Sequence, residues 1–256
     1  MQIIAEVTWV CPAKCEHCPL RDYAHTDVMP IEKFAKVLQL FSKVAEARKE
    51  DKAVVISGGE PTTLLNLSDY VEVARNLGYT TTIVSNCFIP QKLFDAKPDM
   101  LEVSIDYLGI KHDEVRGIPL WDKIALVIRE YPNLLVVRST LFNDNAQDIV
   151  KIRDWVREIR PHPFGGVFVT PVRGKSAVAK APTREQIEKL RKEEGIFVEN
   201  NCPAGINSFT VTPQLHVLAC FLARKELGII REFSEKELEA ITFKGAQLPR
   251  FLCELE

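Results

Sequence analysis

The sequence has no excess of charge of one sign and no hydrophobic run long enough to cross a membrane. Its 33 basic and 35 acidic residues give a formal net charge of −2, so composition predicts no general attraction to nucleic acid or anionic lipid. No apolar stretch approaches the roughly 18 residues of a membrane span. The first residues, MQIIAEVTWV, lack a basic start and include Glu6, which favours a strand over a signal peptide. We therefore expect a cytoplasmic protein with neither a membrane nor a nucleic-acid partner.

A disulfide framework and internal repeats are also missing. Seven cysteines are an odd number for paired bridges, and in an intracellular-looking chain they favour metal or redox chemistry. The 256 residues, 46% of them hydrophobic, are enough for one large α/β domain with a modest appendage.

Strand-like and helix-like stretches alternate through the first 171 residues. The predicted strands cover residues 3–10, 52–57, 80–86, 100–106, 134–141 and 165–171. Helical periodicity is found at residues 31–47, 67–78, 119–130 and 145–159. This alternation predicts an α/β fold, a partial (β/α)6 TIM-like barrel of parallel strands with helices outside. In such barrels the chemistry lies at the carboxyl ends of the strands.

The pattern changes near residue 180, and we divide the chain into a barrel (1–180) and a small C-terminal α+β extension (181–256). Thr183 with Gln186 predicts a capped helix start, and Ser234 caps another short helix. The stretch NSFTVTPQLHVLAC alternates as a hairpin does around Pro213.

The loop after the first predicted strand, WVCPAKCEHCPL, contains Cys11, Cys15 and Cys18. Soft thiolates at short spacing favour zinc or an iron–sulfur cluster. Three thiolates leave one of four positions open, and an open position distinguishes a catalytic metal site from a structural one. A structural zinc loop with His17 as fourth ligand is the alternative.

The spacing Cys-x3-Cys-x2-Cys after a first strand resembles the signature of the radical S-adenosylmethionine (SAM) superfamily. The resemblance implies a [4Fe–4S] cluster on Cys11, Cys15 and Cys18, with the amino and carboxylate groups of SAM on the open iron. It also implies reductive cleavage of SAM to methionine and a 5′-deoxyadenosyl radical, with electrons from a donor such as ferredoxin or flavodoxin. His17 stands before the third cysteine, where the family usually has an aromatic residue that packs near the adenine.

Two further stretches match the family after the second and third predicted strands. In SGGEP, Gly58 and Gly59 allow close approach of the backbone to a ligand, and Glu60 offers a carboxylate acceptor. The resemblance implies that this motif binds the amino group of SAM. Asn86 ends the third strand, where relatives often carry Thr-Asn-Gly.

The segment SIDYLGIKHDEVRG resembles the stretch after the fourth strand in the peptide-modifying and sulfatase-maturing branch. There a serine, and an arginine twelve residues later, hold the ribose or carboxylate of SAM. Ser104 and Arg116 have this spacing, and a guanidinium is suited to bidentate carboxylate binding. The backbone at Val169, after the sixth strand, faces the adenine in relatives.

The C-terminal cysteines resemble those of the twitch and SPASM extensions, which bind an auxiliary [4Fe–4S] cluster. Cys202 and Cys220 flank the predicted hairpin, and Cys253 lies near the C-terminus. The resemblance implies a second iron–sulfur cluster in a shortened module whose fourth ligand is open. A zinc site or ordinary buried thiols are the alternatives.

The leading hypothesis is a radical SAM enzyme that abstracts hydrogen from a small-molecule or peptide substrate, leading to dehydrogenation, cyclisation or bond formation. A glycyl-radical activating enzyme acting on a partner protein is one alternative, and a non-catalytic SAM or iron–sulfur binding protein is another. The sequence assigns no catalytic side chain. Polar residues expected inside the barrel either bind substrate or form supporting ion pairs: Glu6, Thr8, Glu102, Arg138 and Arg173.

Overall fold

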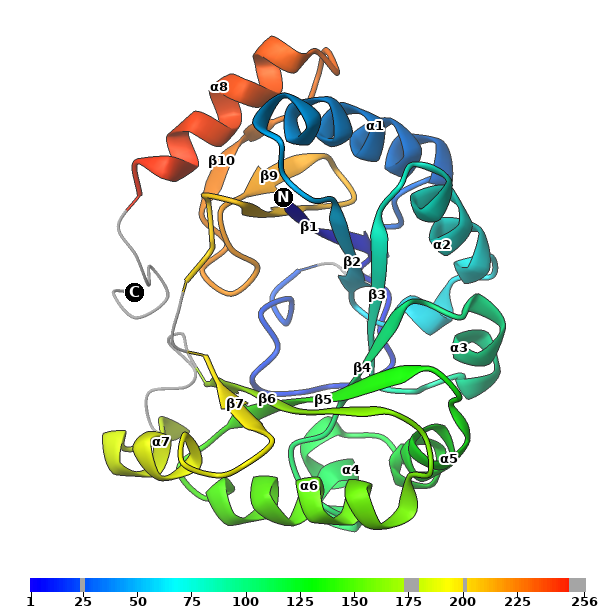
Figure 1. Ribbon diagram of the computed structural model, residues 1–256, viewed down its shortest axis with the longest axis vertical. Coiled ribbons are helices and arrows are strands. Elements are labelled where there is room, and N and C mark those ends of the chain that lie inside the picture. Colours follow the sequence, from blue (N-terminus) through cyan, green and yellow to red (C-terminus); the bar gives the residue numbers. More distant parts are fainter. Residues whose placement is uncertain (24–25, 173–179, 200–201, 249–256) are drawn as a thin grey trace.

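One strongly curved sheet forms the inner layer of the molecule, and helices pack on its outer face (Figure 1). The structure is a computed structural model that describes residues 1–23, 26–172, 180–199 and 202–248. The sheet has the strand order β10-β9-β8-β1-β2-β3-β4-β5-β6-β7. Helices alternate with its central strands, which confirms the predicted α/β, partial-barrel fold. No helix in these four ranges is both long and apolar enough to span a membrane.

The barrel part contains six parallel strands with helices between them. Its strands are β1 (Gln2–Thr8), β2 (Ala53–Gly58), β3 (Thr80–Ser85), β4 (Met100–Ser104), β5 (Leu134–Leu141) and β6 (Phe164–Pro171). Its helices are α1 (Ile31–Arg48), α2 (Leu67–Asn76), α3 (Pro90–Ala96), α4 (Ile110–Arg116), α5 (Trp121–Glu130) and α6 (Ala146–Ile159), with a 3-10 turn η1 (Pro61–Thr63). Each strand and helix predicted for this part is present, and α3 and α4 are additional.

The two faces of the sheet differ in burial. Along β5, Leu135, Val137 and Leu141 are fully buried in the core beneath the helices, whereas Arg138 and Thr140 on the opposite face are half-buried. Because side chains alternate between faces along a strand, the inner face of the barrel presents polar, partly accessible groups. The loop that follows β1 lies on this inner side (Figure 1).

The C-terminal residues extend the same sheet at both ends. After α7 (Arg184–Leu190), β7 (Ile196–Val198) pairs with β6, while β8 (Ser208–Val211) pairs in parallel with β1. Strand β9 (His216–Leu218) pairs antiparallel with β8 and with β10 (Glu226–Ile229), and α8 (Glu235–Ala246) packs beside α1. The predicted hairpin and both helix caps are therefore present. The sheet shows no break near residue 180, so the boundary placed there stays a prediction.

Candidate active site

The cysteine loop is fastened to the first residues after β2. The backbone amide of Gly59 donates to the carbonyl of Thr8 at 2.6 Å, and that of Glu60 donates to the carbonyl of Val10 at 2.9 Å. A Cβ on Gly58, whose φ is +120°, would lie 2.1 Å from the carbonyl oxygen of Thr8, and one on Gly59 would lie 2.4 Å from that of Val10. Such distances exclude any side chain. The two glycines therefore set the position of the cysteine loop, and their contact with SAM stays a prediction.

The carboxylate of Glu60 joins two of the loops at this end of the sheet. It accepts hydrogen bonds from the amide of Thr62 at 3.0 Å, the hydroxyl of Ser85 at 2.7 Å and the amide of Asn86 at 2.8 Å. Burial raises the pKa of Glu60, and these donors act in the opposite direction. With three donors and 1% exposure, Glu60 connects these loops in this structure, and its binding of the amino group of SAM stays a prediction.

Two nitrogen donors point at the sulfurs of the cysteine loop. The side-chain amide of Asn86 lies 3.9 Å from Sγ of Cys11, and Nη1 of Arg116 lies 3.8 Å from Sγ of Cys15. Hydrogen bonds to sulfur orient and tune thiolate ligands of iron–sulfur clusters. The predicted site residues Asn86 and Arg116 are thus brought together with two of the three loop cysteines.

The three thiols are a donor set suited to iron, and Cys11 would ionise only beside positive charge. Burial raises the pKa of Cys11 to about 12, and the neighbouring Glu60, Cys15 and Cys18 act in the same direction. A thiolate in this position needs compensating positive charge, which iron supplies. Within the described ranges, no three His, Cys, Asp or Glu side chains are placed to hold a single metal ion. The ring of His17 instead turns Nε2 toward Oδ2 of Asp106 at 3.7 Å, which does not support the zinc alternative.

Arg116 has a partner that the sequence analysis did not assign. Its Nη2 donates to Oδ2 of Asp106 at 2.6 Å, and Oδ1 of this fully buried carboxylate accepts from the amide of Thr140 at 2.8 Å. Although burial favours neutral forms, the carboxylate raises the pKa of Arg116 and the guanidinium lowers that of Asp106. The contact of Arg116 with SAM stays a prediction. The other terminal nitrogen of the guanidinium, Nη1, lies beside Sγ of Cys15. The sequence could have indicated Asp106 as a site residue, since it follows Ser104 by two residues in the same motif.

His112 completes the buried surroundings of Asp106. Its Nδ1 accepts from the backbone amide of Asp106 at 3.3 Å, and the residue is fully buried. Burial, followed by the charge of Arg116, lowers the pKa of His112 to about 4. The ring is therefore neutral at physiological pH and carries its proton on Nε2.

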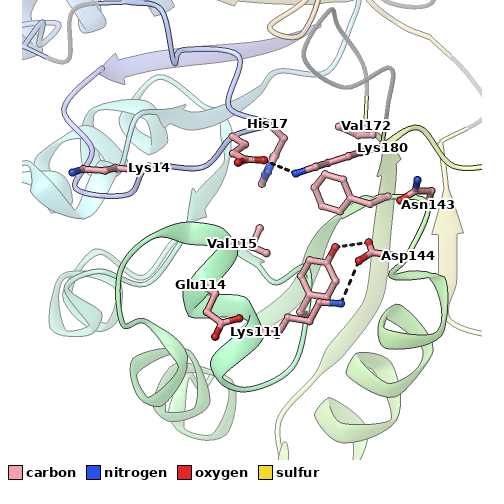
Figure 2. Close-up of a pocket in the computed structure, with 12 residues that line it drawn as sticks. Lys14, His17, Lys111, Glu114, Val115, Asn143, Asp144, Val172 and Lys180 are labelled. Carbon is pink, nitrogen blue, oxygen red and sulfur yellow. Dashed lines mark hydrogen bonds and ion pairs between the residues drawn. The ribbon is translucent and has the colours of Figure 1, made fainter.

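A cavity of about 450 Å³ opens beside the cysteine loop (Figure 2). Its lining comes from that loop, α4, and the segments that follow β4, β5 and β6: Lys14, Glu16, His17, Tyr107, Lys111, Glu114, Val115, Phe142, Asn143, Asp144, Val172 and Lys180. His17 packs edge-on against Phe142 with ring centroids 5.2 Å apart, and burial lowers the pKa of His17 to about 4. Ion pairs at the rim join Glu16 to Lys180 and Lys111 to Asp144.

Val169 lies near the end of β6, and the contact of its backbone with SAM stays a prediction. Its side chain is 1% exposed in the core, and its carbonyl accepts from the amide of Glu199 at 3.0 Å. Val172, just beyond β6, lines the cavity. Ser104 ends β4 and is half-buried; its contact with SAM stays a prediction.

The C-terminal cysteines lie at the predicted hairpin. Cys202 precedes β8 and Cys220 follows β9, and both are half-buried. The amide of Leu222 donates to Sγ of Cys220 at 3.3 Å. Cys253 and the barrel candidate Arg173 lie outside the described residues.

A buried ion pair connects this C-terminal segment to the cysteine loop. The guanidinium of Arg224 donates to both carboxylate oxygens of Glu6 at 2.7 and 3.1 Å, and Nε1 of Trp9 donates to the same carboxylate at 2.8 Å. The guanidinium also lies 4.6 Å from the ring centroid of Tyr23. Neither the pair nor its partners follow from sequence spacing, because Glu6 and Arg224 are 218 residues apart.

Comparisons with known proteins give a family match. The family model of the Radical SAM superfamily matches residues 6–156. A curated relative, the S-adenosyl-L-methionine-dependent tRNA 4-demethylwyosine synthase of Pyrococcus horikoshii, is 28% identical over 164 residues, which are 58% of this chain and 48% of the relative. The enzyme of the same name from Pyrococcus abyssi gives the same figures. The chain thus spans about half the length of these relatives.

Solved structures share the fold at low sequence identity. Streptococcus suis SuiB bound to S-adenosylmethionine has a TM-score of 0.69 at 16% identity, over 86% of this chain and 60% of that one. The protein anSMEcpe, with bound AdoMet and a peptide, has a TM-score of 0.66 at 17% identity, over 93% of this chain and 79% of that one.

Proposed function

The chain belongs to the radical SAM superfamily, and on this premise we propose that it is an enzyme that removes hydrogen from a small-molecule or peptide substrate. The observation that carries the proposal is the placement of N–H donors from Asn86 and Arg116 against the sulfurs of Cys11 and Cys15, beside a cavity of about 450 Å³. Cys11, Cys15 and Cys18 would hold a [4Fe–4S] cluster. When bound, the cluster and SAM together supply an organic radical able to take a hydrogen atom from an unreactive C–H bond.

The cavity suits the adenosine part of SAM. Its volume lies within the range of pockets that take ligands of this size, roughly 300–1,000 Å³. Phe142, Val115 and Val172 give it an apolar wall, and the neutral ring of His17 offers a flat face without adding charge. Asp106 holds Arg116 beside Cys15, so the arginine presents one fixed edge to a carboxylate at the cluster.

We also propose an auxiliary iron–sulfur cluster on Cys202, Cys220 and Cys253, in a shortened module of the twitch or SPASM type. The support is that Cys202 comes before β8 and Cys220 follows β9, so the two cysteines flank the antiparallel hairpin at its open end. An external donor such as ferredoxin or flavodoxin would provide electrons. The curated relatives are named for a tRNA product, whereas the charge balance of this chain favours a substrate other than nucleic acid.

The test is anaerobic reconstitution with iron and sulfide, followed by incubation with SAM and dithionite. We expect 5′-deoxyadenosine and methionine, detected by chromatography, from the native sequence. Replacing Cys11, Cys15 and Cys18 by alanine should abolish both products. The matched control is Cys87→Ala, which removes a buried thiol that is not a proposed ligand and should retain them. Continued cleavage of SAM by the triple variant would refute the assignment.

The same triple variant tests the second cluster. It should keep about four irons, and these should disappear when Cys202 and Cys220 are also replaced. If the triple variant contains zinc or no metal, the auxiliary-cluster proposal is wrong, and the proposal for the first cluster is unaffected.

A further inference from the structure

Four side chains form a row across the inner face of the sheet, from β4 to β7. Ser104 is in register with Arg138, Arg138 with Phe168, and Phe168 with Phe197. Side chains in register on parallel strands project to the same face, with about 4.8 Å between strands. The row therefore begins at the predicted SAM contact Ser104 and continues along the wall formed by β5, β6 and β7 (Figure 1).

One edge of the Arg138 guanidinium pairs with Glu102, and the other edge faces the interior of the barrel. Its Nε and Nη2 both reach Oε2 of Glu102, at 2.9 and 2.8 Å. The Glu102 side chain is 8% exposed, but that of Arg138 is 38% exposed. In the part of the chain that the structure describes, no other carboxylate pairs with Arg138. Its Nη1 and the second hydrogen of Nη2 are therefore available to an anion from the interior of the barrel.

Two aromatic rings continue the row beyond this guanidinium. The Cζ atom of Arg138 lies 5.6 Å from the ring centroid of Phe168, and the rings of Phe168 and Phe197 are 5.1 Å apart at 30°. Phe197 is 51% exposed. The two phenylalanine rings form a partly exposed apolar surface. At one end of this surface lie the N–H donors of Arg138 that Glu102 does not occupy.

The ion pair between Arg224 and Glu6 is enclosed to a different degree from that of Arg138. Arg224 meets both oxygens of Glu6, and its side chain is only 10% exposed. That guanidinium is enclosed by protein and serves the structure. Arg138 shares a single oxygen of its glutamate and is several times more exposed, as expected of a group that faces a ligand.

We propose that Arg138 binds the carboxylate of the substrate, whose apolar body rests on Phe168 and Phe197. This inference rests on the proposed function and narrows its substrate class to carboxylic acids with an aromatic or aliphatic body. A planar carboxylate matches the guanidinium fork. Because Glu102 already balances one positive charge, a monoanion suits the site better than a dianionic phosphate. Arg138 on β5 is in register with Ser104 on the neighbouring strand β4, so a substrate bound to Arg138 would lie next to the predicted SAM site.

The experiment measures the affinity of a probe and does not depend on turnover. Phenylacetate is titrated by calorimetry into reconstituted, unreduced protein with SAM present, and neutral phenylacetamide serves as the matched ligand. We expect phenylacetate to bind more tightly than the amide. Arg138→Gln should weaken phenylacetate binding by about tenfold or more, and Glu102→Gln should strengthen it by removing the competing carboxylate. Arg129→Gln, at an exposed position of α5 outside the barrel, should leave it unchanged.

The double variant E102Q/R138Q retains a neutral, hydrogen-bonded pair, and it should also bind weakly if the single variant fails to fold. Equal affinity for phenylacetate in the native protein and the folded Arg138 variants would overturn the proposal. Equal binding of phenylacetamide, or tighter binding of inorganic phosphate, would overturn the substrate class. Failure of the native protein to cleave SAM would instead count against the proposed function, so the two failures are distinguishable.

Discussion

Replacing Arg224 by methionine should loosen the attachment of the C-terminal hairpin to the cysteine loop. The change leaves the 3% exposed carboxylate of Glu6 with Trp9 as its remaining side-chain donor. Removing one partner of a buried ion pair costs about 3–5 kcal/mol, mostly because the other charge stays buried without compensation. Since a domain is stable by only about 5–15 kcal/mol, the expected loss is a large part of the total.

Anaerobic guanidinium unfolding measures this loss, and release of iron from the reconstituted protein reports the cysteine loop. Glu6→Gln removes the stranded charge and keeps an acceptor for Trp9. The double variant E6Q/R224M should therefore be more stable than Arg224→Met alone. Arg231→Met replaces an exposed arginine of the same segment and should change stability by less than about 0.5 kcal/mol. A loss below about 1 kcal/mol for Arg224→Met, or no recovery in the double variant, would refute the reasoning.

Two other predictions concern the surroundings of the cysteine loop. Gly59→Ala should reduce iron content after reconstitution, because its Cβ would lie 2.4 Å from the carbonyl of Val10 and displace the loop; full iron content by colorimetric analysis would contradict this. Stability should fall as the pH falls from about 6.5 to about 4, because the unfolded histidine binds a proton near pH 6.5 whereas burial lowers the pKa of His112 to about 4. The contribution is on the order of 3 kcal/mol. Unfolding midpoints measured across this range should depend less on pH in His112→Asn, and an unchanged slope would show that another group titrates.

The strands and long helices were predictable because their patterns repeat several times. Helix α1 has apolar residues every three or four positions over 18 residues, which fixes both its type and its buried face. Helices α3 and α4 have seven residues each, so the helical period has no room to repeat. Two turns cannot be distinguished from a loop by periodicity alone.

The candidate site was predictable where it depends on local spacing. Cys11, Cys15 and Cys18 lie on the loop after β1, Asn86 follows β3, and Arg116 ends α4, the helix after β4, so parallel topology brings them together. The partners of the charged groups outside the Ser104–Gly117 motif were not predictable. The pairing of Arg138 with Glu102 depends on the register between two strands, which the sequence does not specify.

The position of β1 between β2 and β8 has a consequence for the order in which the molecule assembles. Gln2 is in register with Ala53 on one side and with Ser208 on the other, so one neighbour of β1 is synthesised soon after it and the other about two hundred residues later. Contacts at such separation form late, because the intervening chain must be ordered first. During synthesis β1 therefore keeps an unpaired edge, which invites pairing with other chains. The contact of Arg224 with Trp9 of the cysteine loop likewise forms only after residue 224 has been made, so the loop gains this support late.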